Sequence, residues 1–258
     1  MKSVKIIVAA HKSVKVSEDP LYLPIFVGAS GKEDIGFQRD DVGDNVSELN
    51  PYFCELTGLY WAVHHLDCDY IGLCHYRRYF KGAGKGSNKL DHVLTLEEAD
   101  RLLNDYDVIL PKKRHYYIES IYDHYRNTMY VEPLDICGEI IQEMYPEYYP
   151  EFEKLHQRRS AHMFNMLVMR KDILDGYCEW LFSILFELMK RVDVSQYDSF
   201  HARFPGRISE RLLDVYINTN HIQYTEVPVI DTGNTNWFRK ITGFIKSTIF
   251  KTKYDSSF

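Results

Sequence analysis

The sequence predicts an α/β protein with a mostly parallel central sheet flanked by helices. Two short apolar runs, Val4 to Ala10 and Tyr70 to Cys74, lack polar alternation. This composition is typical of strands that are covered on both faces. Between them, from Asn50 to Val63, apolar residues recur at helical spacing and lead into the second strand. The 258 residues suffice for one large core, so we expect a single domain over residues 1–233.

The remaining elements follow from turn residues and periodicity. We expect further strands at 22–28, 106–111, 162–169 and 224–230, and further helices at 95–98, 134–144, 150–158, 180–192 and from Ser209 onward. Pro24 favours an edge position for the strand at 22–28. A sharp turn at Pro205 and Gly206 should precede the last helix. The irregular loop at 30–50 is long enough to be functional. The loop at 81–89, rich in Gly and Lys, is either a lid or a solvated turn.

Composition and charge exclude several classes of protein. The net charge of -6 argues against general binding of nucleic acid, which requires a basic face. The five cysteines form no C-x-x-C pair, so we expect free thiols in a reducing compartment. The N-terminus does not have the pattern of a signal peptide, and no apolar run approaches the roughly 20 residues that cross a bilayer. We therefore expect a cytoplasmic protein.

The candidate active site lies where the strand at 70–74 ends, because His75, Arg77 and Arg78 follow it without a polar spacer. Ligands of α/β sheets bind outside the carboxyl ends of the strands. Arginine forks suit phosphate oxygens, so we predict a phosphate or diphosphate ligand. A structural ion pair is the alternative for the arginines. His11 and Lys12 follow the first strand and should reach the same edge.

Asp67 and Asp69 resemble the aspartate pairs that hold a divalent metal on a nucleotide diphosphate. They precede the strand at 70–74, however, and should therefore lie at the opposite end of the sheet from His75. We interpret them as turn residues and assign no metal ligand, so that Mg²⁺ or Mn²⁺ is not favoured as a cofactor. The arginines would then neutralise a leaving diphosphate.

Glu210, beside Arg207 and Arg211 at a predicted helix start, is our candidate general base. The alternative is an acid that stabilises the helix N-terminus. The sequence contains no G-x-S-x-G, Walker, H-E-x-x-H or G-x-G-x-x-G motif. Hydrolase, kinase, zinc-protease and dinucleotide-binding functions therefore lose their main support.

Residues 234–258 differ in composition from the rest. Apolar and aromatic residues such as Trp237 and Phe244 alternate with lysines. This pattern is typical of a basic amphipathic helix in an anionic membrane interface. Packing of the same helix against the domain is the alternative.

Two segments, 50–61 and 70–80, closely resemble the bacterial polysaccharide-synthesis family known as domain of unknown function 4422. The segments 162–166 and 207–212 are similar to the same family. The likeness extends from about Lys5 to Asp231, and the Glu-Leu-Thr and His-Tyr-Arg-Arg motifs are its most specific parts.

The resemblance implies a GT-A-like glycosyltransferase of capsule, exopolysaccharide or O-antigen synthesis. It implies a nucleotide-sugar donor, with UDP-galactofuranose as a candidate, and inverting transfer with Glu210 as the base. The acceptor would be a lipid-linked saccharide, reached at the inner face of the membrane through the tail. A non-catalytic sugar- or nucleotide-binding module and a nucleotide-sugar hydrolase remain as alternatives.

These considerations assign the following site residues. The donor-binding candidates are Ala10, His11, Lys12, Asp44, Asn45, Glu55, Thr57, His75, Arg77 and Arg78. The acceptor-binding candidates are Tyr79, Tyr117, His124, His162, Asn165, Arg207 and Arg211.

Overall fold

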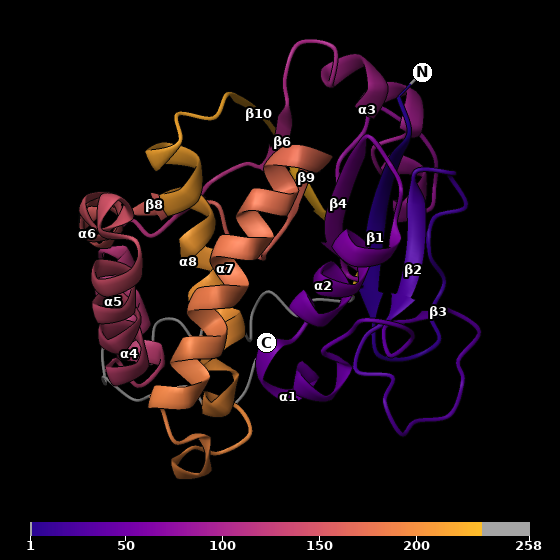
Figure 1. Ribbon diagram of the computed structural model, residues 1–258. Helices are drawn as coiled ribbons and strands as arrows, with labels where there is room; N and C mark the ends of the chain where they lie inside the picture. Colours follow the sequence, from indigo (N-terminus) through magenta and orange to yellow (C-terminus); the bar gives the residue numbers. More distant parts are fainter. Residues whose placement is uncertain (1, 234–258) are drawn as a thin grey trace.

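The computed structural model describes residues 2–233. They are built around one large mixed sheet (Figure 1). Its seven-strand path has the order β10-β6-β9-β4-β1-β2-β3. The strands of this path are β1 (Val4–Ala10), β2 (Tyr22–Phe26), β3 (Gln38–Arg39), β4 (Tyr70–His75), β6 (Val108–Pro111), β9 (Leu167–Arg170) and β10 (Tyr224–Val227). Two further strands, β5 (Arg78–Phe80) and β11 (Val229–Asp231), extend it from the end of β4. The predicted α/β class is confirmed.

One antiparallel strand interrupts an otherwise parallel path. β9 is antiparallel to both β4 and β6, so β4 and β6 run in the same direction. β1 is parallel to β2 and β4, and β10 is parallel to β6. The carboxyl ends of β1, β2, β4, β6 and β10 therefore meet at one edge, which we call the carboxyl edge.

The sheet separates two apolar cores because successive side chains of a strand point to opposite faces. In β1, Ile7 and Ala9 face the larger core, whereas Ile6 and Val8 face the smaller one. The larger core is covered by α1 (Asn50–Phe53), α2 (Leu56–His65), α4 (Ile121–Thr128), α5 (Glu132–Met144), α6 (Tyr149–Gln157), α7 (Lys171–Arg191) and α8 (Phe204–Thr219). The smaller core is covered by α3 (Leu96–Leu102) and β5. A separate pair of short strands, β7 (Arg114–His115) and β8 (Ser160–Ala161), lies beyond the main sheet.

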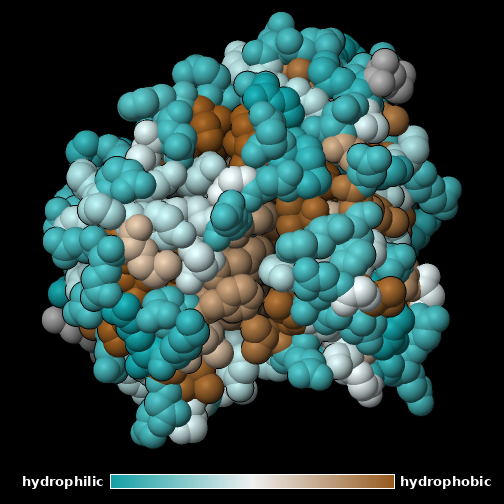
Figure 2. Space-filling view, viewed as in Figure 1, coloured by the Kyte–Doolittle hydropathy of each residue, from teal (hydrophilic) through white to brown (hydrophobic). Residues whose placement is uncertain are grey.

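The face shown in Figure 2 is largely hydrophilic, with an apolar area near its centre. A groove of about 500 Å³ between α2 and α7 is lined by Tyr60, Val63, His64, Asp175, Cys178, Glu179, Phe182, Ser183 and Phe186. Trp180 lies on the same helix but is buried in the core. α7 thus packs one side on the core and lines a surface groove with another.

Several predicted elements differ from the structure, among them the helix expected over 180–192, which begins already at Lys171. The helix expected over 50–63 is broken at Cys54, whose φ of 55° separates α1 from α2. The strand expected over 162–169 begins only at Leu167, because Phe164 and Asn165 adopt left-handed φ values of 77° and 54°. The last helix begins at Phe204, with a proline in its first turn, so the expected turn at Pro205 is wrong.

The early start of α8 also moves Glu210 from the first helical turn to the second. Gly206, next to that proline, packs closely on Cys54, because a Cβ there would lie 3.1 Å from the Cys54 sulfur. This contact brings α8 against α1. A helix-dipole role for Glu210, the alternative considered for it, is weakened by the shift, since the dipole effect falls off within the first turn.

β2 is not an edge strand, since the two-residue β3 pairs beyond it and Pro24 pairs with Val8 on the inner side. Thr95 and Glu98 form a capping box at α3, as the sequence predicts. Within residues 2–233 no helix has the length and apolarity needed to span a membrane. The predicted tail helix at 234–258 lies outside the described residues.

Candidate active site

The ends of β1 and β4 form the centre of the candidate site. Ala9 is paired with His75, so the residues that follow the two strands lie side by side. The His11 ring packs edge-on against Tyr76, with 5.4 Å between ring centroids. The Arg77 backbone N–H donates to His75 Nδ1 at 3.2 Å, which closes the turn between β4 and β5. The sequence prediction that His11, Lys12, His75 and the arginines meet agrees with this arrangement.

The local electrostatics are dominated by positive charge. Burial, followed by the charges of Arg77 and Arg78, lowers the pKa of His75 to about 3. Partial burial and the neighbouring Lys12 likewise lower the pKa of His11. His75 is therefore neutral at neutral pH, and Arg77 and Arg78 supply the positive charge around it.

The two adjacent arginines contact different surroundings. The Arg77 guanidinium lies 5.5 Å from the centroid of the Tyr76 ring. The Arg78 guanidinium lies 4.5 Å from the Phe164 ring, which belongs to the left-handed turn before β9. The two arginines thus border two neighbouring regions, and the prediction that both bind one diphosphate stays a prediction.

The first region is a cavity of about 550 Å³, which we call the basic cavity. It is lined by Lys12, Val14, Lys15, Tyr76, Arg77, Asn88, Lys89, Leu90, Thr232 and Gly233. Among the described residues that line it, every charged side chain is positive. Sequence reasoning missed Lys15, Asn88 and Lys89. The last two belong to or border the loop at 81–89, whose Gly- and Lys-rich composition was the available signal.

The second region, which we call the carboxylate cluster, consists of Glu55, Arg78, Asn165, Arg203 and Glu210. Burial lowers the pKa of Arg78, and the charges of Glu210 and Glu55 oppose that effect. The pKa of Arg203 is raised by Cys54, whose sulfur accepts from Arg203 Nε at 3.1 Å, and also by the charges of the same two carboxylates. Within residues 2–233, Glu210 forms no direct ion pair, although its side chain is only 9% exposed. Arg203 was missed because the sequence prediction began the helix too late.

Asn165 fixes the geometry of this cluster. Its Nδ2 donates to Glu55 Oε1 at 2.9 Å and to the Gly206 carbonyl at 3.1 Å, and its Oδ1 accepts from the Ser209 hydroxyl at 2.9 Å. Asparagine tolerates the left-handed conformation found here better than most residues. Burial raises the pKa of Glu55, and the charge of Glu210 adds to the effect. Asn165 therefore supports Glu55 and does not itself project toward a ligand.

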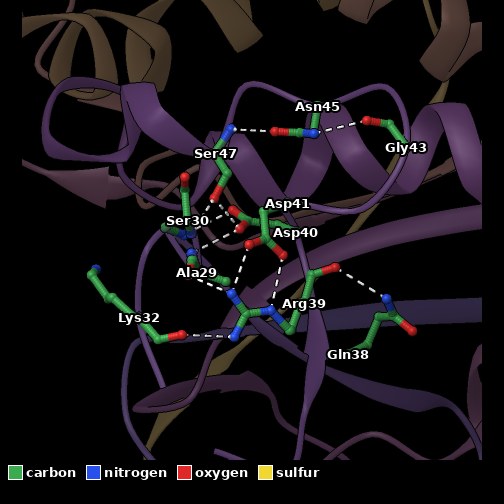
Figure 3. Close-up of polar contacts among 11 residues, drawn as sticks. Ala29, Ser30, Lys32, Gln38, Arg39, Asp40, Asp41, Gly43, Asn45 and Ser47 are labelled. Carbon is green, nitrogen blue, oxygen red and sulfur yellow. Dashed lines mark hydrogen bonds and ion pairs between the residues drawn. The ribbon is translucent and has the colours of Figure 1, made fainter. Parts of the chain in front are cut away.

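Three predicted donor-binding residues, Asp44, Asn45 and Thr57, make contacts in or near the loop that surrounds Asp40, which Figure 3 shows in part. Buried Asp40 accepts from the backbone N–H groups of Gly28 and Ala29 and from the hydroxyls of Ser47 and Thr57, at 2.5 to 3.0 Å. Thr57 is thus fully buried as a partner of Asp40. Asn45 bonds to the Gly43 carbonyl and the Ser47 N–H (Figure 3), and Asp44 contacts Tyr60 and His64 on the later turns of α2.

Several other predicted site residues are structural. Ala10 is fully buried and its carbonyl accepts from the Val27 N–H. Tyr79 is fully buried in the smaller core. His162 is fully buried and bonded to Asp214 and Glu226. His124 pairs with Glu119 at 2.6 Å, and Arg211 is buried against the Tyr125 ring.

Two predicted acceptor residues remain accessible. Arg207 is partly exposed on α8, with its guanidinium 5.6 Å from the Phe200 ring. Tyr117 is highly exposed and stacks on His115, with ring centroids 6.0 Å apart. Arg207 is one turn of helix from Glu210, whereas Tyr117 belongs to the segment that follows β6.

Comparison with known proteins identifies the family. The profile of the family described as "Domain of unknown function (DUF4422)" matches residues 5–221. The chain belongs to this family. No curated protein matches it.

A solved structure also resembles this DUF4422 chain, namely the apo structure of WbbM, a bifunctional glycosyltransferase. The two are 31% identical with a TM-score of 0.83. The match covers 90% of this chain but 46% of the WbbM chain, so the chain spans about half the length of that relative. The fold is therefore that of a glycosyltransferase structure.

The aspartate pair of this DUF4422 chain lies away from the site. Asp69 accepts from the backbone N–H and hydroxyl of Ser3 at 2.8 and 2.9 Å, at the amino end of β4. Asp67 precedes it in the same connection. Over residues 2–233 no group of three or more His, Cys, Asp or Glu side chains is arranged to hold a metal ion.

Proposed function

We propose that the chain is a glycosyltransferase that moves a sugar from a nucleotide-sugar donor to a saccharide acceptor in polysaccharide synthesis. The observation that carries this proposal is the position of the basic cavity beside the carboxylate cluster at the carboxyl edge. Cations suit a nucleotide diphosphate, and a neighbouring carboxylate suits a hydroxyl nucleophile. The similarity to WbbM supports the same activity.

In this proposal the donor diphosphate occupies the basic cavity. Lys12 and Arg77 neutralise its oxygens, and their charged groups lie 5.7 and 5.5 Å from the centroid of the Tyr76 ring. As the bond between the anomeric carbon and the diphosphate breaks, negative charge develops on the leaving oxygen. Fixed cations stabilise that charge without reorganisation. No divalent cation is assigned a role.

Glu210 acts as the general base. Its carboxylate takes the proton from an acceptor hydroxyl as that oxygen attacks the anomeric carbon from the face opposite the diphosphate, which inverts the configuration. Arg78 and Arg203 lie close enough to Glu210 for their charges to interact with it. Glu55, held by Asn165, lies close enough for its charge to act on both arginines.

The finer assignments also belong to this proposal. The donor is a UDP-sugar, with galactofuranose as the candidate sugar, and the acceptor is a lipid-linked saccharide of capsule, exopolysaccharide or O-antigen synthesis. Their support is the family resemblance of segments 50–61 and 70–80.

The direct test is to incubate the full chain with UDP-sugars, UDP-galactofuranose among them, and lipid-linked saccharides, with Mn²⁺ or with chelator. Products are identified by mass spectrometry, and UDP binding is measured by calorimetry. Sugar transfer by the unaltered chain supports the proposal. UDP binding without turnover would instead favour a binding module, and release of free sugar without an acceptor would favour a hydrolase.

A further inference from the structure

The segment after β6 forms an exposed loop at the carboxyl edge. β6 ends at Pro111, and its direction is that of β4, so residues 112–119 leave the sheet at the same edge as His75. Tyr116 within this segment is buried. Burial raises the pKa of Tyr116, and Arg211 and Glu210 are among the charges that act on it. The segment therefore starts beside the proposed active site. We call residues 112–119 the Tyr117 loop.

Two neighbouring side chains of this loop are unusually exposed. Tyr117 is 82% exposed and Ile118 is 66% exposed, whereas the next most exposed large hydrophobic residue within 2–233 is Val42 at 53%. Single exposed apolar residues are common on protein surfaces and require no explanation. Two in succession at the tip of one loop indicate a surface that a partner covers.

The loop is also basic, in a chain whose net charge is -6. Lys112, Lys113, Arg114 and His115 precede the exposed pair without an intervening acid. The exposed Arg159 joins them, because its guanidinium donates to the Tyr117 carbonyl at 3.4 Å. The following acid, Glu119, is turned inward to His124 and Asn127. The tip thus presents two apolar side chains within a positively charged surround.

The backbone holds this tip in place. β7 and β8 pair through Arg114 with Ala161 and His115 with Ser160. The Tyr116 N–H donates to the Arg159 carbonyl at 2.7 Å, and the Glu119 N–H donates to the Tyr116 carbonyl at 3.2 Å. The exposed pair therefore lies at the two central positions of a four-residue turn. Such support keeps the pair exposed, because the turn is fixed by hydrogen bonds on both sides.

We propose that the Tyr117 loop binds the surface of an anionic membrane, with Tyr117 and Ile118 entering the interface and the surrounding cations contacting lipid headgroups. Tyrosine favours the membrane interface, and nearby Lys and Arg are attracted to anionic lipid. A sugar ligand would account for an exposed tyrosine ring but not for an isoleucine, which offers no polar group. Docking here holds the carboxyl edge close to the membrane plane. This proposal does not depend on which sugar is transferred.

The test is cosedimentation of the full chain with vesicles of phosphatidylglycerol and phosphatidylcholine, compared with phosphatidylcholine alone. The double variant Tyr117→Ser with Ile118→Ser should lower the partition coefficient for the anionic vesicles about tenfold, because it removes most of the inserted apolar area. Tyr106→Ser is the matched control, since Tyr106 is also exposed but precedes β6 at the opposite edge. The control should bind as the unaltered chain does.

A local probe separates the loop from the tail. Trp237→Phe removes the tail indole, and Tyr117→Trp or Tyr106→Trp is then added to that variant. Brominated anionic lipid should quench the added indole at position 117 but not at position 106. Equal quenching at both positions, or none at 117 while the protein is bound, would overturn the proposal. So would a double serine variant that keeps full vesicle binding.

Discussion

Two polar clusters at the carboxyl edge are built in opposite ways. Around Asp40, each carboxylate oxygen accepts two hydrogen bonds, and the charge is enclosed by its donors, of which Ala29 and Ser47 are labelled in Figure 3. In the carboxylate cluster, Glu210 and the two arginines influence one another through their charges, and none of them forms an ion pair within residues 2–233. Both contain buried carboxylates, but the second has unused hydrogen-bonding capacity.

This difference distinguishes a carboxylate that stabilises the fold from one that can bind a ligand. A fully bonded carboxylate stabilises the loop that surrounds it and has no free lone pair for a ligand. A carboxylate without a direct partner costs stability, and proteins retain such groups chiefly where chemistry needs them. Substitutions should therefore affect stability in the first cluster and turnover in the second.

The largest expected effect is on turnover. Glu210→Gln should lower kcat about 10³-fold, within the range for loss of a general base, because the amide cannot accept the acceptor proton. UDP affinity should change less than twofold. Glu187→Gln is the control and should leave kcat unchanged, because Glu187 is a partly exposed carboxylate on α7 that pairs with Lys190 and Arg191 outside the site. Steady-state kinetics and calorimetry provide the two values. Turnover that survives the substitution would remove Glu210 as the base.

The second largest effect is on stability. Asp40→Asn should lower the free energy of unfolding by about 3 kcal/mol, because the new amide N–H₂ faces backbone and hydroxyl donors that lose their acceptor. The neighbouring Asp41→Asn is the matched control. Its partly exposed pair with Arg39 should contribute less than about 1 kcal/mol. Urea denaturation with an unchanged m-value measures both. Equal losses for the two variants would contradict the distinction between the clusters.

A third effect concerns the basic cavity. Lys12→Ala and Arg77→Ala should each weaken UDP binding about tenfold, and the loss should shrink as salt is raised, because the interaction is electrostatic and accessible to ions. Lys154→Ala, which removes an exposed lysine paired with Glu151 on α6, is the charge-matched control. Calorimetry at two salt concentrations measures the effect. An unchanged affinity in both cavity variants would move the diphosphate elsewhere.

The sequence predicted those parts of the site that depend on strand order. His11 and His75 meet because β1 and β4 are parallel neighbours, a relation that two apolar runs with an intervening helix can indicate. Asn165 and Arg203 could not be placed in the same way. Their positions depend on a left-handed turn at Phe164 and Asn165 and on the start of α8 at Phe204, which short-range sequence patterns did not reveal.

Composition also misassigned polar residues whose partners are distant in sequence. Thr57 reaches Asp40 across 17 residues, and His162 reaches Asp214 across 52. A polar residue beside a motif has the same appearance in sequence whether it faces a ligand or a buried partner. Only tertiary contacts distinguish the two cases.

The smallest expected effect is a pH-dependent gain in stability from Glu55→Gln. Burial raises the pKa of Glu55 above its value in the unfolded chain, so its stabilising contribution is complete below that unfolded value, about 4.3, and is lost as the pH rises through the folded pKa. Glutamine stays neutral and still offers an oxygen to the Asn165 amide. The melting temperature of the variant should therefore equal that of the unaltered chain near pH 4 and lie a few degrees above it at pH 7. A gain that is the same at both pH values would show that the buried charge is not its cause.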